Sequence, residues 1–109
     1  MFNAVLKRPG LPGEVVVINS EEDIAEYFPE GAYCVPFFDT VFKRKLLYFE
    51  TCGAGFNIAK AKKLNGRQFN FELGGIRYFG DVLTLFANEY DIPLDVPACE
   101  LKRLQAWLS

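Results

Sequence analysis

The stretch of the sequence that comes closest to a phosphate-binding pattern is residues 51–67, TCGAGFNIAKAKKLNGR. Dinucleotide-binding loops need G-x-G-x-x-G or a final alanine, because the third small residue lets the helix pack closely on the strand. Gly53 and Gly55 fit the first two positions, but Ile58 occupies the third. The Gly-Lys-Ser/Thr of a P-loop is also missing from the chain. A small-molecule or nucleotide site near Gly53 and Gly55 is therefore kept as an alternative prediction.

The same stretch ends in four cations, which are Lys60, Lys62, Lys63 and Arg67. Their charges can pair with phosphates, and the nearby Phe56 offers a ring on which a base can stack. The whole chain has a net charge of −2, whereas electrostatic nucleic-acid binders usually carry a net positive charge. Direct nucleic-acid binding through this segment is a second alternative, beside a contact with a protein partner and the simpler interpretation of a hydrated loop.

The sequence contains no histidine, so the usual general base at neutral pH and the commonest metal ligand are both missing. The three cysteines, Cys34, Cys52 and Cys99, fit no C-x-x-C zinc or redox spacing. Their odd number in a cytosolic chain predicts buried, reduced thiols. Cys52 is a candidate for an exposed nucleophile, but no histidine can activate it. We therefore expect a protein that is not an enzyme and that uses no metal and no cofactor.

Charge is distributed unevenly along the chain. Residues 43–67 carry seven basic residues and one acidic residue, a balance of +6, and the remainder carries five basic and thirteen acidic residues, a balance of −8. Four carboxylates lie close together at Glu21, Glu22, Asp23 and Glu26. The positive end of a helix accounts for the first three. An acidic surface can also imitate nucleic-acid phosphates on a basic target, so these four residues are the predicted protein-binding residues.

The elements that must position these residues are short strands separated by turns. Alternating or β-branched apolar runs predict strands over residues 2–7, 15–18, 32–40, 43–50 and 67–73. Pro36 places its strand at a sheet edge or a bulge. In the strand over 67–73, the alternation predicts Phe69, Phe71 and Leu73 inward and Asn70 outward. Residues 81–90 fit both a helix and a strand, and their β-branched and aromatic content favours the strand.

Three helical segments are predicted. Ser20 can cap a short helix that Pro29 and Gly31 end, and residues 57–64 fit one or two helical turns. Asp95 can cap a terminal helix with Pro97 in its first turn, whose apolar stripe is Ala98, Leu101, Leu104 and Leu108 with Trp107 beside it. The prediction is a single α+β domain over residues 1–109. It has a mostly antiparallel sheet of about six strands, with a short N-terminal helix and a C-terminal helix packed on it.

Short segments across nearly the whole chain resemble a family of small uncharacterised proteins that is defined only as a domain of unknown function. The resemblance is carried by EVVVINSEEDIAEYF, GAYCVPF, NIAKA, IRYFGDVL and DIPLDVPACELKRLQAWL. The segment GAYCVP at 31–36 is similar to the family's Gly-Tyr-x-x-Val-Pro strand, whereas Ile58 replaces the Arg of its Asn-Arg-Ala segment. Its members occur in bacteria, many of them gut Firmicutes, and in their phages and mobile elements.

The resemblance implies an accessory protein that acts by contact, because the family defines no catalytic residue. The leading hypothesis is a non-enzymatic phage or mobile-element protein that binds and blocks a bacterial protein or nucleoprotein complex, such as a CRISPR-type or restriction defence component. The start MFNAVLKRPG does not resemble a signal peptide and no run of about 18 apolar residues occurs, so we expect the host cytoplasm and no membrane partner. The high aromatic content, 16%, also suggests a homodimer through an exposed apolar patch.

Overall fold

The computed structural model describes residues 1–40, 42–51, 63–64, 66–73 and 75–108 of the 109-residue chain. In chain order the elements are β1 (Phe2–Lys7), β2 (Glu14–Ile18), α1 (Glu21–Tyr27), β3 (Ala32–Asp39), β4 (Arg44–Thr51), β5 (Lys63–Leu64), β6 (Arg67–Leu73), β7 (Ile76–Phe79), β8 (Val82–Ala87) and α2 (Ala98–Leu108).

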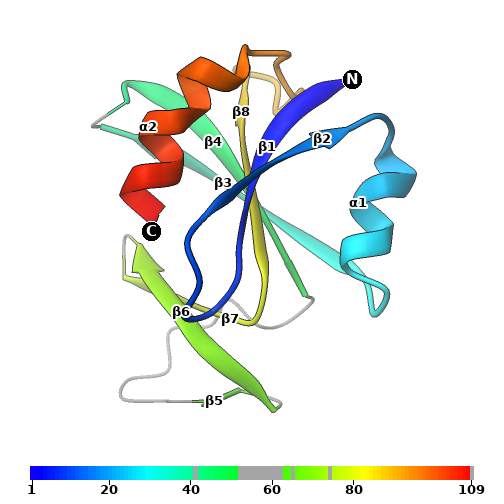
Figure 1. Cartoon of the computed structure of the whole chain (residues 1–109), viewed down its shortest axis with the longest axis vertical. Helices are drawn as coiled ribbons and strands as arrows, with labels where there is room; N and C mark the ends of the chain where they lie inside the picture. The colour runs from blue at the N-terminus through cyan, green and yellow to red at the C-terminus, as the bar shows by residue number, and fades with distance from the viewer. Residues whose placement is uncertain (41, 52–62, 65, 74, 109) are drawn as a thin grey trace.

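Within these residues the strands form two antiparallel sheets (Figure 1). The main sheet has the order β2-β1-β8-β4-β3, and the second sheet has the order β5-β6-β7. The predicted α+β class is confirmed, including the C-terminal helix. The prediction of one sheet of about six strands is wrong in its layout, because the strands divide into a sheet of five and a sheet of three.

Strand β8 is the centre of the main sheet and is buried on both faces. It pairs with β1 on one side and with β4 on the other. All six of its residues are buried: Leu83 and Leu85 belong to one core cluster and Val82 and Phe86 to the other. Apolar side chains on both faces erase the alternation that marks a half-exposed strand, which is why the sequence alone does not separate strand from helix here. The favoured strand is confirmed.

Different elements cover the two faces of the main sheet (Figure 1). On the face that we call the α2 face, α2 and Tyr78 of the second sheet join one buried cluster, whose members are Val5, Leu46, Tyr48, Tyr78, Val82, Phe86, Val96, Leu101, Leu104 and Leu108. On the opposite face, the α1 face, Ile24 and Phe28 at the helix join a second cluster with Ala4, Leu6, Ile18, Leu47, Leu83, Leu85 and Ala87. The short helix α1 lies mainly against the part of this face near β2.

The second sheet contains an irregularity that changes one predicted orientation. The register between β6 and β7 shifts between Phe69 and Phe71, so Asn70 is the extra residue of a bulge. Asn70 is predicted to point outward, but it is half-buried, and its amide nitrogen donates to the carbonyl oxygens of Lys7 and Gly80, both at 2.8 Å. The bulge thus uses Asn70 to attach the second sheet to the end of β1.

Both helix starts differ in detail from the predictions. The Ser20 side chain makes no capping hydrogen bond; instead, the Asp23 carboxylate accepts one from the Asn19 amide at 2.8 Å. Helix α2 begins at Ala98, and the Glu100 amide donates to the Pro97 carbonyl, so Asp95 lies too early to cap it.

The apolar stripe of α2 is narrower than predicted, because Ala98 is exposed, whereas the leucines of the stripe are buried as expected. Lys63 and Leu64 form β5 rather than the end of a helix; residues 57–62 lie outside the described residues.

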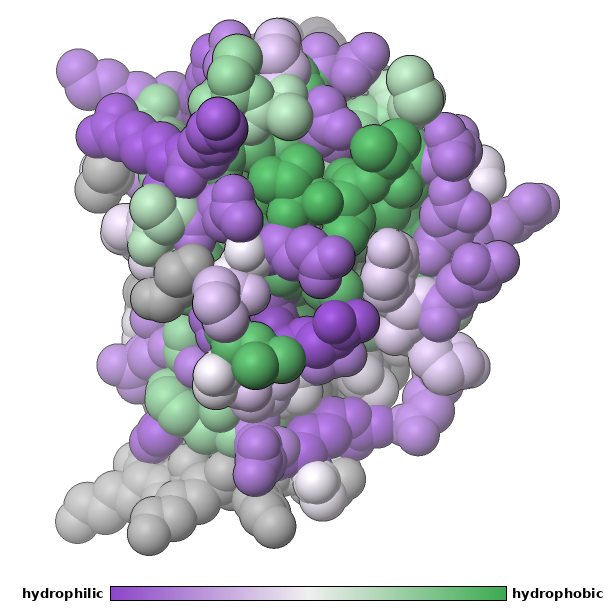
Figure 2. All heavy atoms as spheres, viewed as in Figure 1, coloured by the Kyte–Doolittle hydropathy of each residue, from purple (hydrophilic) through white to green (hydrophobic). Residues whose placement is uncertain are grey.

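Strands β2 and β3 are the two edges of the main sheet. Pro36 lies on β3, which confirms its predicted edge position. Lys43, with φ of 54°, lies in the turn before β4. Strands β3 and β4 form an antiparallel hairpin. Only β4 is covered on both faces, because Cys34 and Phe38 on β3 are exposed. Figure 2 shows apolar side chains also gathered at the surface between the two helices, where β2 lies and where Val17 is exposed.

Candidate functional site

The four acidic residues predicted to bind a protein lie on α1, and three of them are at the surface. Glu21, Glu22 and Glu26 are exposed, whereas Asp23 is half-buried and engaged in its hydrogen bond with Asn19. The structure therefore leaves three carboxylates of this group facing solvent. Glu21 also lines a hollow beside the helix.

That hollow, which we call the α1 groove, has a volume of about 480 Å³ and lies on the α1 face. Its apolar side chains come from the sheet, the helix and the chain after β8. The lining residues are Phe2, Glu21, Ile24, Cys34, Leu47, Phe49, Asp91, Ile92 and Pro93. The groove exists because α1 covers one part of this face and leaves the part over β4 and the edge strand β3 open.

The wall of the groove opposite α1 is a turn held by the Asn88 side chain. Its carbonyl oxygen accepts hydrogen bonds from the amides of Tyr90, at 2.8 Å, and Ile92, at 3.1 Å. The backbone N–H of Asn88 donates to the backbone carbonyl of Ile92 at 3.0 Å, and Pro93 forms an isolated β-bridge with Ala87. These bonds fix a turn in which Asp91 adopts a left-handed φ of 63°. The wall is thus formed before any partner arrives.

Apolar side chains continue from the groove onto the surface around it. Phe38 is 61% exposed and Ile92 is 56% exposed. Phe38 lies opposite Lys45 in the β3–β4 register, and Lys45 forms an ion pair with Asp91 in the groove wall. Tyr90, in the same turn, is 74% exposed. Large side chains so open to water in one neighbourhood are typical of a contact surface.

Two of the three cysteines differ from their prediction in exposure. Cys34 and Cys99 are free but exposed rather than buried, and Cys52 lies outside the described residues. Partial burial raises the pKa of the Cys34 thiol, Asp91 raises it further, and Lys45 opposes the change. A raised pKa keeps the thiol protonated at neutral pH, so Cys34 is poorly suited to act as a nucleophile.

The predicted basic site is only partly visible. Lys60 and Lys62, like Gly53 and Gly55, lie outside the described residues, and Lys63 is described only as backbone of β5. Arg67 is half-buried and forms an ion pair with Glu30, which follows α1. The Arg67 charge is thus balanced by a carboxylate from the acidic part of the chain.

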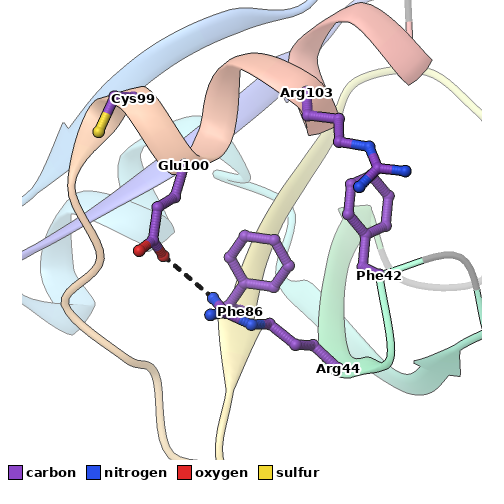
Figure 3. Close-up of a pocket in the computed structure, with 6 residues that line it drawn as sticks. All are labelled: Phe42, Arg44, Phe86, Cys99, Glu100 and Arg103. Atoms are coloured by element: carbon purple, nitrogen blue, oxygen red, sulfur yellow. Dashed lines mark hydrogen bonds and ion pairs between the residues drawn. The ribbon is translucent and has the colours of Figure 1, made fainter.

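A second hollow lies where α2 crosses the ends of β4 and β8, and we call it the α2 pocket. It has a volume of about 360 Å³ and is lined by Phe42, Arg44, Phe86, Cys99, Glu100 and Arg103 (Figure 3). Arg44 donates to the Glu100 carboxylate at 3.1 Å. The guanidinium of Arg44 lies over Phe86, 5.1 Å from the ring centroid, and that of Arg103 lies over Phe42 at 5.3 Å.

Buried polar groups lie between the main sheet and the second sheet. Tyr48, Glu50 and Thr84 are at most 1% exposed. Burial, with smaller contributions from Asp39 and Tyr78, raises the pKa of Tyr48, and burial with Glu50 raises that of Tyr78. Both phenols therefore stay neutral at ordinary pH. Within the described residues, no three His, Cys, Asp or Glu side chains are placed to hold a metal ion.

No family model, no curated protein and no solved structure matches this chain. Neither α1 nor α2, the helices of the described part of the chain, is long and apolar enough to cross a membrane.

Sequence reasoning missed both hollows, although it named Glu21 on the rim of one. Each hollow joins residues more than 40 positions apart, such as Phe49 with Ile92 and Arg44 with Arg103. Spacing along a chain carries no signal for such pairs. One local signal exists in the sequence: Asn88 and Asp91 have the Asn-x-x-Asp spacing that is common in turns, and this turn forms a wall of the α1 groove.

Proposed function

We propose that this protein is a non-enzymatic binding protein whose α1 groove receives a segment of a bacterial protein. The observation that carries the proposal is the groove itself: an apolar hollow of about 480 Å³ that exposed Ile92 lines, with exposed Phe38 on the neighbouring surface. Covering those side chains removes apolar surface from water, which is the main driving force of protein association.

The walls of the groove favour binding because they need little reorganisation. Phe49 and Leu47 belong to β4, which is paired on both sides. Ile92 belongs to the turn that Asn88 holds. Side chains fixed before contact lose little conformational entropy on binding, and that cost otherwise reduces affinity.

Charge at the rim indicates the composition of the bound segment. Glu21 lines the groove, and Glu22 and Glu26 are exposed on the same helix. On the opposite wall, Asp91 is paired with Lys45 and adds little net charge. The rim is thus negative on the α1 side, and complementary partners carry Lys or Arg beside their apolar side chains.

Blocking of the partner is the consequence that we propose for this contact. The resemblance to proteins of phages and mobile elements supports a bacterial target in the cytoplasm, such as a CRISPR-type or restriction defence component. Basic nucleic-acid-binding surfaces of such targets carry the Lys and Arg residues that the acidic rim complements. Capture of that surface would keep nucleic acid away from it.

The test is a selection of displayed segments that tile bacterial proteomes, performed on the full chain. We expect enriched segments that combine alternating apolar residues with Lys or Arg. Their addition should shift the amide resonances of Phe49, Ile92 and Ile24 in an NMR titration. Selection without enrichment, or shifts confined to the α2 face, would show that the α1 groove is not the binding surface.

A further inference from the structure

We infer that the α2 pocket binds a small organic anion, whose carboxylate or phosphate group pairs with Arg103 and whose apolar body rests against Phe42 and Phe86. The pocket lies on the α2 face of the main sheet, whereas the α1 groove lies on the other face, so this inference is independent of the protein-binding proposal.

The side chains that line the α2 pocket carry a net charge of +1, from two arginines and one glutamate. Arg44 and Glu100 form an ion pair at 3.1 Å and offset each other. Within the described residues no carboxylate lies within ion-pair distance of Arg103, whose guanidinium nevertheless faces the same hollow (Figure 3). One anionic group placed beside Arg103 would complete the pairing.

The Arg103 guanidinium is held in a defined position by an aromatic cluster. It lies over Phe42, whose ring contacts Phe86 at 6.0 Å and Trp107 at 5.8 Å between centroids. The Phe42 amide donates to Asp39 Oδ1 at 3.0 Å, which fixes the turn that carries the ring. A guanidinium stacked in this way offers two parallel N–H donors that match a carboxylate or a phosphate, with less entropy lost on binding.

The size of the pocket limits the ligand. A volume of about 360 Å³ is near the lower end of pockets that hold small molecules. Its lining combines the two phenylalanines with three charged side chains. The pocket thus suits a ligand with a single ring or a short apolar chain and one anionic group.

The experiment compares phenylacetate and phenyl phosphate with the neutral phenylacetamide. Trp107 is the only tryptophan of the chain and its ring packs against Phe42, so its fluorescence responds to changes at this lining residue of the pocket. We expect saturable changes with at least one of the two anions, and the tighter anion identifies carboxylate or phosphate as the preferred group. Phenylacetamide should bind at least about tenfold more weakly, because it cannot form the charge-assisted pair.

Variants locate the effect. Arg103→Gln should weaken anion binding by about tenfold or more, whereas Lys102→Gln, which removes a neighbouring exposed cation outside the pocket, should change it by less than about twofold. Arg103→Lys keeps the positive charge but removes the planar guanidinium with its two parallel N–H donors, so the affinity of this variant for the anion should lie between those of wild type and Arg103→Gln. Equal effects of Arg103→Gln and Lys102→Gln, equal binding of the amide, or no saturation with either anion would each overturn the inference.

Discussion

Two buried hydroxyl groups show how single residues limit the stability of this protein. Tyr48 and Thr84 are 0% exposed and lie opposite each other in the β4–β8 register. Neither hydroxyl has a hydrogen-bond partner in the described part of the structure. A buried polar group without a partner costs about 1–3 kcal/mol relative to its hydrated state.

Thr84→Val should therefore stabilise the protein. Valine has nearly the shape of threonine and removes the hydroxyl from the core. We expect the free energy of unfolding to rise by about 1 kcal/mol, measured by urea denaturation. A fall of similar size would mean that the Thr84 hydroxyl makes a stabilising hydrogen bond.

The buried phenols also predict how stability depends on pH. Tyr48 and Tyr78 ionise near their usual pKa of 10.0 in the unfolded chain, but their pKa values are raised in the folded protein. Above about pH 10 the unfolded state therefore holds fewer protons, and the free energy of unfolding falls as pH rises. Tyr48→Phe should make this fall less steep in urea denaturation between pH 9 and pH 11. An identical slope in the variant would contradict the account.

At the scale of elements, the turn after β8 is the part of the fold that shapes the α1 groove. Asn88→Ala removes the acceptor of two amide hydrogen bonds and leaves the side chain of Ile92 in place. We expect a loss of about 1 kcal/mol in unfolding free energy and weaker binding of the selected segment. Calorimetric titration measures the second effect. Unchanged affinity together with reduced stability would show that the wall does not need to be fixed.

Helix α2 is attached to the main sheet by three leucines, and Leu104 is fully buried. Leu104→Ala should lower the free energy of unfolding by about 2–5 kcal/mol, because it leaves a cavity in the core of the α2 face. Lys102→Ala, an exposed change on the same helix, should have an effect below about 0.5 kcal/mol. Similar effects of both variants in urea denaturation would contradict the packing described here.

The sequence predicts elements where a local rule decides them. Pro36 indicates the edge strand, and the leucine spacing in α2 indicates its buried side. The sequence does not predict features that depend on contacts between distant residues. Asn70 points inward because the Lys7 and Gly80 carbonyls accept its hydrogen bonds, and no local pattern contains that information. The hollows of the candidate sites belong to the same class.

At the scale of the whole molecule, folding partly neutralises the basic segment 43–67 by forming ion pairs with carboxylates from other parts of the chain. Three cations of the basic segment 43–67 pair with carboxylates from elsewhere: Arg44 with Glu100, Lys45 with Asp91, and Arg67 with Glu30. Exposed pairs of this kind contribute at most about 1 kcal/mol each. Their larger effect is on surface charge, because Glu21, Glu22 and Glu26 of α1 stay exposed, and Glu21 lines the apolar groove.

The most direct test of the proposed function compares two substitutions of exposed apolar residues on opposite faces. Ile92 lines the α1 groove and is 56% exposed, and Val17 lies on the edge strand β2 and is 52% exposed. Calorimetric titration with the best selected segment should show at least about a tenfold loss of affinity for Ile92→Ser. For Val17→Ser it should show no more than about a twofold change. Equal affinities for wild type and Ile92→Ser would contradict the claim that this protein acts through the α1 groove.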